Sequence, residues 1–257
     1  MKWASAISDE HDLGQALETL GDQIVAQLDG LEPNLIMVFV SPHHAMDYEQ
    51  VPRYFDDRFP NAVLVGCSGG SIIGARREIE REPAISVIAA HLPDVAIEPF
   101  WLSGEEIESR IEDPNSWSPR LHMEPEHQPV FVIFPDPFSC DGQALVNSLQ
   151  EAYPEAVIVG GLVSGGRTEG SHALFHQADM HTGGMVGLGM YGDVVIDPIV
   201  AQGARPIGNP MIATRSEDHV IFELDGSPAV QVLDHLMRTI GKEERELFRR
   251  SPMIGLA

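Results

Sequence analysis

The sequence has few cysteines and no long apolar run. Cys67 and Cys140 are the only cysteines among 257 residues, too few for a scaffold held together by disulfides. The longest apolar run, Leu35 to Val40, is far shorter than the roughly 20 residues that cross a bilayer. The first residues lack the pattern of a signal peptide. These absences predict a soluble, cytoplasmic protein.

Positive charge is also scarce. The chain has 16 basic and 39 acidic residues, a formal net charge of −23, and Lys2 and Lys242 are its only lysines. A surface this negative repels phosphate backbones and anionic lipid heads, which argues against nucleic acid or a membrane as the main partner. The hydrophobic content of 43% and the charged content of 21% are those of an ordinary globular chain.

An internal repeat is present. Three segments recur in the same order, and in each an apolar run meets the same turn residues. Because all three recur at a similar offset, the sequence predicts two copies of one structural unit, at about residues 30–103 and 127–202. The matched segments are NLIMVFVSP with QPVFVIFPDP, FPNAVLVGCSGG with YPEAVIVGGLVSGG, and SVIAAHLPDVAIEPF with MVGLGMYGDVVIDPI.

Each copy begins with a buried strand, an amphipathic helix and a second buried strand, which predicts two parallel strands joined by a crossover helix. Two further strands close each copy, Ala84–Ala90 with Val95–Trp101 and Gly184–Met190 with Val194–Ile199. Their short separations predict antiparallel hairpins. The predicted fold class is therefore mixed α/β, with two pseudo-repeated βαβ-plus-hairpin units whose mixed sheets pack against helices.

The segments outside the copies have their own signals. Residues 9–28 predict an amphipathic helix, and Ser103 with Glu106 predicts a capping box. The Pro-rich residues 112–128 are predicted to join the two copies. Residues 1–225 would then form the first domain. Residues 226–257, with a helix capped by Ser227, would begin a second domain that is cut short.

Two glycine-rich corners are the main candidates for a binding site. Each follows the second strand of a copy, and ligands of open α/β sheets bind at the carboxyl ends of such strands. Glycine leaves backbone amides free to hold a carboxylate, phosphate or carbonyl. The alternative is that these are tight turns between packed copies. The expected contacts, in one cleft between the copies, are Gly66, Cys67, Ser68, Gly69, Gly70, Gly160, Gly161, Ser164, Gly165 and Gly166.

Three arginines near glycine-rich turns are candidate cations. Arg205, and less directly Arg76 and Arg77, could bind a ligand carboxylate through two parallel hydrogen bonds. The alternative is that they form surface ion pairs with Glu78 and Glu80, or with Asp197, and exposed pairs of this kind are common and weak.

Two other patterns suggest different chemistry. Cys67 lies at a corner, and His43 or His44 could act as its base, which would make a cysteine-dependent hydrolase or transferase. The alternative is a buried, unreactive thiol. His172, His176 and His181, with Asp179, form a pattern in which the first two could chelate a metal on a helix. On a hairpin, which the surrounding residues favour, those two would lie ~13 Å apart, too far to share one ion without a bend.

Three segments resemble FIST domain proteins, the F-box and intracellular signal transduction family. They are AVLVGCSGGSIIG, ISVIAAHLPDVAIEPFWL and GARPIGNPMIATRSEDHVIFELDGSPAVQVL, of which RPIGNP and ELDG are the most specific. The match covers roughly residues 30–240, which is nearly all of the family's N-terminal region and only the start of its C-terminal region.

The resemblance implies a bacterial, intracellular sensory domain. It would bind a small ligand such as an amino acid or another small carboxylate, without catalysis, and act with a histidine kinase, a cyclic-dinucleotide enzyme or a chemoreceptor. Some relatives bind haem and sense nitric oxide, which leaves haem on His172 or His176 as an alternative. No other cofactor is expected, and no catalytic residues are implied.

Overall fold

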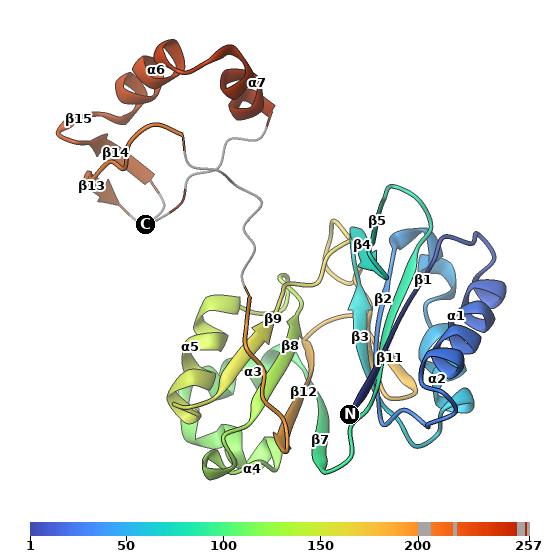
Figure 1. Cartoon of the computed structure of the whole chain (residues 1–257). Helices are drawn as coiled ribbons and strands as arrows, with labels where there is room; N and C mark the ends of the chain where they lie inside the picture. Colours follow the sequence, from blue (N-terminus) through green and yellow to red (C-terminus); the bar gives the residue numbers. More distant parts are fainter. Residues whose placement is uncertain (200–206, 218–219, 251–254, 256–257) are drawn as a thin grey trace. The chain divides into compact units, whose positions relative to one another are not determined.

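The computed structural model describes residues 1–199, 207–217, 220–250 and 255 (Figure 1). The chain forms two compact units, Met1–Pro198 and Ile199–Ala257, here called unit 1 and unit 2. Within the described residues, no helix is both long enough and apolar enough to cross a membrane.

Unit 1 contains two large sheets built on the same plan. The first has the order β1-β6-β2-β3-β10-β11 and the second β7-β12-β8-β9. The order β1-β6-β2-β3 therefore matches β7-β12-β8-β9 strand for strand, so the repeat in the sequence is also a repeat in the structure. The strands of the first sheet are β1 (Lys2–Ser8), β2 (Leu35–Val40), β3 (Val63–Ser68), β6 (Ile85–His91), β10 (Leu174–His176) and β11 (Asp179–His181); those of the second are β7 (Val95–Leu102), β8 (Val130–Pro135), β9 (Val157–Gly160) and β12 (Met185–Gly192).

The predicted βαβ crossovers are present in both halves. Strands β2 and β3 are parallel and joined through α2 (Gln50–Arg58), and β8 and β9 are parallel and joined through α5 (Gly142–Ala152). The α/β class with mixed sheets is therefore confirmed.

The predicted closing hairpins are wrong. Strand β6 pairs with β1 and β2, whereas β7 pairs with β12 in the other sheet. In the second half, β12 pairs with β7 and β8, and residues 194–199 form no strand. The physical reason is that the short link between β6 and β7, residues 92–94, connects two facing sheets rather than two neighbouring strands. Each half thus begins with β1 or β7 and ends with β6 or β12.

The two sheets pack face to face between two layers of helices (Figure 1). One apolar cluster joins the first sheet to α1 (Leu13–Gln27) and α2, and a second joins the second sheet to α3 (Gly104–Glu112), α4 (Trp117–Leu121) and α5. A third cluster fills the space between the sheets. There the Phe39 and Phe134 rings meet edge to face at 5.3 Å, a favourable aromatic geometry.

Local signals explain where the main helices begin. The Asp12 side chain accepts a hydrogen bond from the Gln15 amide at the start of α1. The predicted capping box at the start of α3 is confirmed, since Ser103 and Glu106 each bond the other's backbone amide. Such caps satisfy amides that have no partner within the helix.

The Pro-rich residues 112–128 fold against the second sheet. They form η2 (Pro114–Ser116), α4 and η3 (Pro125–His127). Trp117 is fully buried, and its indole N–H donates to Ser148 Oγ at 2.9 Å. This segment therefore contributes core residues to the second half in addition to connecting the chain.

A hairpin from the second half completes the first sheet. Strands β10 and β11 lie between β9 and β12 in sequence, yet β10 pairs antiparallel with β3. The equivalent connection in the first half, β4 (Ser71–Gly74) and β5 (Arg77–Glu80), forms a separate small sheet. The two halves are thus linked by strand pairing as well as by packing.

Unit 2 has a thin core. It contains β13 (Ala213–Glu217), β14 (Val220–Leu224), β15 (Ser227–Pro228), α6 (Ala229–Thr239) and α7 (Lys242–Arg250). Ala229 is its one buried apolar residue within the part the structure describes. The prediction that Ser227 caps the helix is wrong: the N-cap of α6 is Pro228, which makes no side-chain hydrogen bond.

Candidate functional site

The structure brings the two glycine-rich corners into direct contact. The Ser68 hydroxyl donates to the Ser164 carbonyl at 2.9 Å, and the Gly70 amide donates to Ser164 Oγ at 3.0 Å. A methyl group added at Gly165 would lie 3.2 Å from the Gly69 backbone. The corners meet because each follows a strand whose carboxyl end points to the same edge of unit 1.

Most amides at this junction already have partners within the protein. Ser68 N–H donates to Ala173, Gly69 N–H to Val40 and Gly161 N–H to Ile133, at 2.8, 2.9 and 3.2 Å. Ser164 N–H donates to the Ser68 carbonyl at 3.4 Å. The expectation that these amides are free for a ligand is therefore not met, and a ligand at this edge must use other groups.

Several of the glycines permit close packing of the backbone. A Cβ on Gly66 would lie 2.0 Å from the Val38 carbonyl oxygen, and one on Gly166 would lie 2.7 Å from the His172 ring. Gly160 has a φ of +143° and would clash with the Ile133 carbonyl. At Gly161, by contrast, an added Cβ meets nothing within 4 Å.

The second corner lines a cleft of about 370 Å³. The cleft lies where β8 and β9 end and α5 begins, a position at which open α/β sheets bind ligands. Its lining is mostly apolar, and Gln143 supplies the polar side chain. The lining residues are Ile133, Pro135, Gly142, Gln143, Val146, Ile158, Val159, Gly160, Gly161 and Leu162.

Next to this cleft in sequence lies a buried polar pair. His172 Nδ1 and Asp136 Oδ1 are 2.8 Å apart, with side chains 3% and 1% exposed. Ser139 Oγ donates to the other Asp136 oxygen at 2.6 Å. The Phe138 ring, itself 47% exposed, stacks on the His172 imidazole. His172 Nε2 is buried without a hydrogen-bond partner.

Sequence reasoning missed Asp136 and Ser139, although a signal for both was present. They directly follow the buried strand β8, so the rule that singled out the glycine corners applies to them too. A buried histidine whose Nδ1 faces a carboxylate has a fixed orientation and presents its other nitrogen.

Cys67 is placed in the core between the sheets. It is 5% exposed and belongs to an apolar cluster with Val65 and Leu174. Burial raises the pKa of this thiol to about 12, so the thiolate needed for nucleophilic attack is disfavoured. His44, a candidate base, is buried, and burial lowers its pKa. This environment matches the alternative of a buried, unreactive thiol.

The other histidines of the motif lie on the β10–β11 hairpin. The His176 and His181 rings are 6.3 Å apart, and His181 stacks on Trp101 at 3.9 Å. Burial lowers the pKa of both imidazoles. Within the residues that the structure describes, no three histidine, cysteine or acidic side chains are grouped to hold a metal.

Two of the three predicted cations, Arg76 and Arg77, lie on the β4–β5 hairpin that follows the first corner. Arg77 forms an exposed ion pair, as the alternative expected, but its partner is Asp9 rather than Glu78 or Glu80. Arg76 adopts a positive φ of 65° in the turn between β4 and β5. Arg205 lies outside the described residues.

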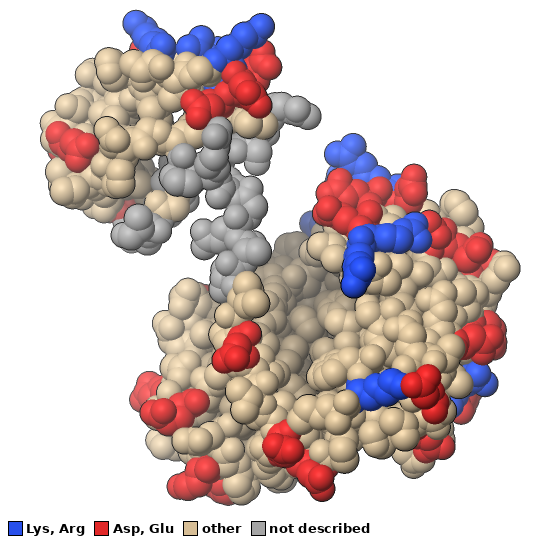
Figure 2. All heavy atoms as spheres, in the orientation of Figure 1, with Lys and Arg blue, Asp and Glu red and all other residues tan. Residues whose placement is uncertain are grey.

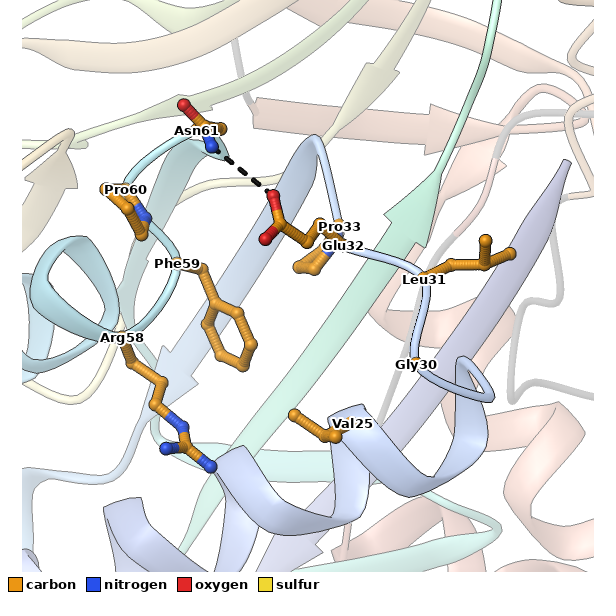
Figure 3. A pocket seen from close by; sticks show the side chains of 9 residues that line it. All are labelled: Val25, Gly30, Leu31, Glu32, Pro33, Arg58, Phe59, Pro60 and Asn61. Atoms are coloured by element: carbon orange, nitrogen blue, oxygen red, sulfur yellow. Dashed lines mark hydrogen bonds between the residues drawn. The ribbon is translucent and has the colours of Figure 1, made fainter.

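A second, smaller cleft lies at the opposite ends of β2 and β3 (Figure 3). It measures about 270 Å³. Arg58 and Glu32 lie on opposite sides of the Phe59 ring, and Asn61 donates to Glu32 at 3.3 Å. Arg58 also pairs with Asp22 at 3.0 Å. None of the sequence motifs described above pointed to this cleft.

Acidic side chains are spread over the visible face of unit 1, with few basic ones between them (Figure 2). The same view shows this face hollowed between the two halves. Unit 1 is thus a duplicated α/β domain with joined glycine corners and a mostly apolar cleft at one corner.

Comparison with known proteins gives the family. Residues 34–227 match the model of the FIST N domain, and the chain belongs to this family of signalling-associated domains. It is 30% identical over 262 residues to an uncharacterized protein of Mycobacterium tuberculosis and 31% identical over 245 residues to an uncharacterized protein of Mycobacterium bovis. The alignments cover 100% and 95% of this chain, but only 65% and 61% of those relatives.

Proposed function

We propose that this chain is an intracellular sensory domain that binds a small carboxylate, such as an amino acid or a derivative, without catalysis. The cleft lined by Gly160, Gly161 and Leu162 carries the proposal. It lies at the strand ends where α/β sheets bind ligands, and its apolar lining suits the hydrocarbon part of such a molecule.

The carboxylate would face the start of α5. The positive end of a helix dipole favours an anion there, and Gln143 offers a side-chain amide within the cleft. Asp141 already accepts from the Gln143 and Ala144 amides, so the ligand would bind beside this cap. The 39 acidic residues of the chain disfavour anion binding elsewhere on its surface, so a carboxylate ligand would bind selectively at this helix start.

Signalling requires the ligand to prefer one arrangement of the protein over another. The contact between the glycine corners is the natural element to respond, because Gly161 of the cleft and Ser164 of the contact lie in one loop. The output would pass to a partner such as a histidine kinase or a cyclic-dinucleotide enzyme, as the family's association with signalling suggests.

The test is a thermal-shift screen of amino acids and small carboxylates with matched variants. Gly161→Leu places a side chain in the cleft at a position with open space, and we expect it to abolish a ligand's shift. Asn61→Leu, in the smaller cleft, serves as the control and should keep the shift. No hit at about millimolar concentration, or equal loss in both variants, would contradict the proposal.

Haem sensing remains a second candidate because of His172. Its Nε2 is unpartnered and its Nδ1 contacts Asp136, which is the hydrogen bond typical of a metal-bound histidine. Neither cleft described above is lined by His172 or His176. A visible absorption spectrum after haem addition, compared between the natural chain and His172→Ala, tests it.

A further inference from the structure

Strand β9 has an open edge at a position where its counterpart is covered. In the first half, β3 pairs with β2 on one side and with β10 on the other. In the second half, β9 occupies the place of β3, and within the described residues it pairs with β8 alone. The same structural unit is therefore seen once with its outer edge occupied and once without.

The side chains differ accordingly. All of β3 except its first residue is buried, whereas Val157, Ile158 and Val159 of β9 are half-buried and Gly160 is exposed. Leu162, just beyond the strand, is 58% exposed. The segment from Val157 to Val163 contains no charged residue and no proline. Natural edge strands usually carry such residues to prevent pairing, so this edge is unprotected.

The larger cleft lies at the carboxyl end of the same strand. Its lining includes the consecutive residues Ile158, Val159 and Gly160, whose side-chain positions alternate between the two faces of the sheet. The lining also includes Ile133 and Pro135 of β8, so the cleft lies at the carboxyl ends of both strands. A strand added at the outer edge of β9 would pair with it and could place an apolar side chain in the cleft at its carboxyl end.

We propose that β9 is a strand-acceptor site, to which a partner protein adds an extended, uncharged and apolar segment running antiparallel to β9. An added strand gains affinity from main-chain hydrogen bonds and specificity from a side-chain pocket. A globular second copy fits less well. The 4 residues of β9 span about 13 Å, too little to bury the roughly 1,200 Å² of a stable interface.

The register of the added strand on β9 is inferred from the register of β10 on β3. Phe175 lies opposite Gly66 and Leu174 opposite Cys67; the equivalent positions in β9 and beyond are Gly160 and Gly161. Two glycines opposite large apolar residues leave room for those side chains beside the cleft. The occupant therefore resembles β10, with large apolar residues facing Gly160 and Gly161.

The alternation of hydrogen bonds makes the proposal testable with peptides. Ser68 N–H donates to Ala173 and Gln177 N–H donates to Leu64, so the odd-numbered residues of the β10 segment point their backbone groups at β3. The probe is a fluorescein-labelled peptide with the sequence of residues 171–177, SHALFHQ, added to the full chain. N-methylation at Phe175 removes a pairing N–H, whereas N-methylation at Leu174 removes one that points away.

We expect the unmodified peptide to bind, methylation at Phe175 to weaken binding at least about tenfold, and methylation at Leu174 to change it less than about twofold. Leu162→Lys should weaken binding about fivefold or more, while Leu31→Lys in the smaller cleft should not. No binding at about 1 mM, equal effects of both methylations, or an unaffected Leu162→Lys variant would overturn the proposal.

This inference is independent of the small carboxylate proposed above, because the peptide experiment contains no other ligand. The two proposals share the cleft. A carboxylate found by the thermal-shift screen is therefore expected to compete with the peptide.

Discussion

Ser164 and Gly70 belong to different halves of unit 1, yet the Gly70 amide donates to Ser164 Oγ at 3.0 Å. The neighbouring bond from Ser68 Oγ to the Ser164 carbonyl, at 2.9 Å, joins the same two corners. The corners are thus connected by hydrogen bonds through one residue of the second corner, and its side chain is the part that mutation can remove.

Ser164→Ala removes the acceptor of the Gly70 amide. We expect it to lower the free energy of unfolding by about 1 kcal/mol, measured by urea denaturation of the full chain. Ser118→Ala is the matched control: its hydrogen bond to Glu124 is exposed like that of Ser164, but it joins residues close in sequence, and its loss should cost under about 0.5 kcal/mol. Equal effects would mean that the corner contact contributes no particular stability.

Asp136→Asn disrupts the buried pair with His172. Disturbing a buried hydrogen bond leaves a polar atom without a partner, so we expect a loss of about 2 kcal/mol in the free energy of unfolding. A double-mutant cycle with His172→Ala in urea denaturation should give a coupling of at least about 1 kcal/mol. Additive effects would contradict a direct interaction. Asp113→Asn, at an exposed cap, is the control.

Both thiols should react slowly in the folded protein. Burial raises the pKa of Cys67 to about 12 and that of Cys140 to about 11, so little thiolate exists at pH 8. With Ellman's reagent we expect Cys140, the more exposed, to react first and Cys67 only on unfolding. Rapid modification of Cys67 in the folded chain would contradict this prediction and support the hypothesis of a cysteine-dependent hydrolase or transferase.

Stability should fall in mild acid. Burial lowers the pKa of His176 and His181 in the folded state, so the unfolded chain takes up protons first. The contribution is complete above the unfolded pKa of about 6.5 and is lost as the pH falls from there toward the folded values.

Urea denaturation between pH 7.5 and 5.5, each value being about one unit from that midpoint, measures this loss. We expect the variant with both His176→Gln and His181→Gln to show a smaller loss, and His235→Gln, at an exposed site, to match the natural chain. Because His44 is also buried with a lowered pKa, part of the pH dependence of the free energy of unfolding should persist in the double variant. A pH dependence equal to that of the natural chain would show that His176 and His181 do not cause it.

Features set by neighbouring residues were predictable from the sequence. The Ser103–Glu106 capping box and the two βαβ crossovers depend on residues close in the chain. The strand partners of β6 and β7 could not be predicted, because a short turn can connect two adjacent strands or two facing sheets. The packing between the sheets, as of Phe39 on Phe134, decides between these arrangements.

The candidate site was predictable in part. The position of both glycine corners after parallel strands predicted that they lie at one edge of unit 1. The hydrogen bonds of Ser164 to Ser68 and Gly70 of the other corner agree with this placement. The sequence could not reveal that the Ser68 and Gly69 amides are already used, since their acceptors come from Ala173 and Val40, far away in sequence. The open edge of β9 was equally hidden, because it is visible only against the occupied edge of β3.

The pairing of β10 with β3 sets an order for folding during synthesis. The first sheet lacks its outer strands until the ribosome has made the chain through about His181, although β1, β2, β3 and β6 are complete by His91. The outer edge of β3 in the nascent first half therefore stays unpaired while the residues between His91 and His181 are translated. A polypeptide ending between the two halves would expose that edge permanently and is expected to aggregate.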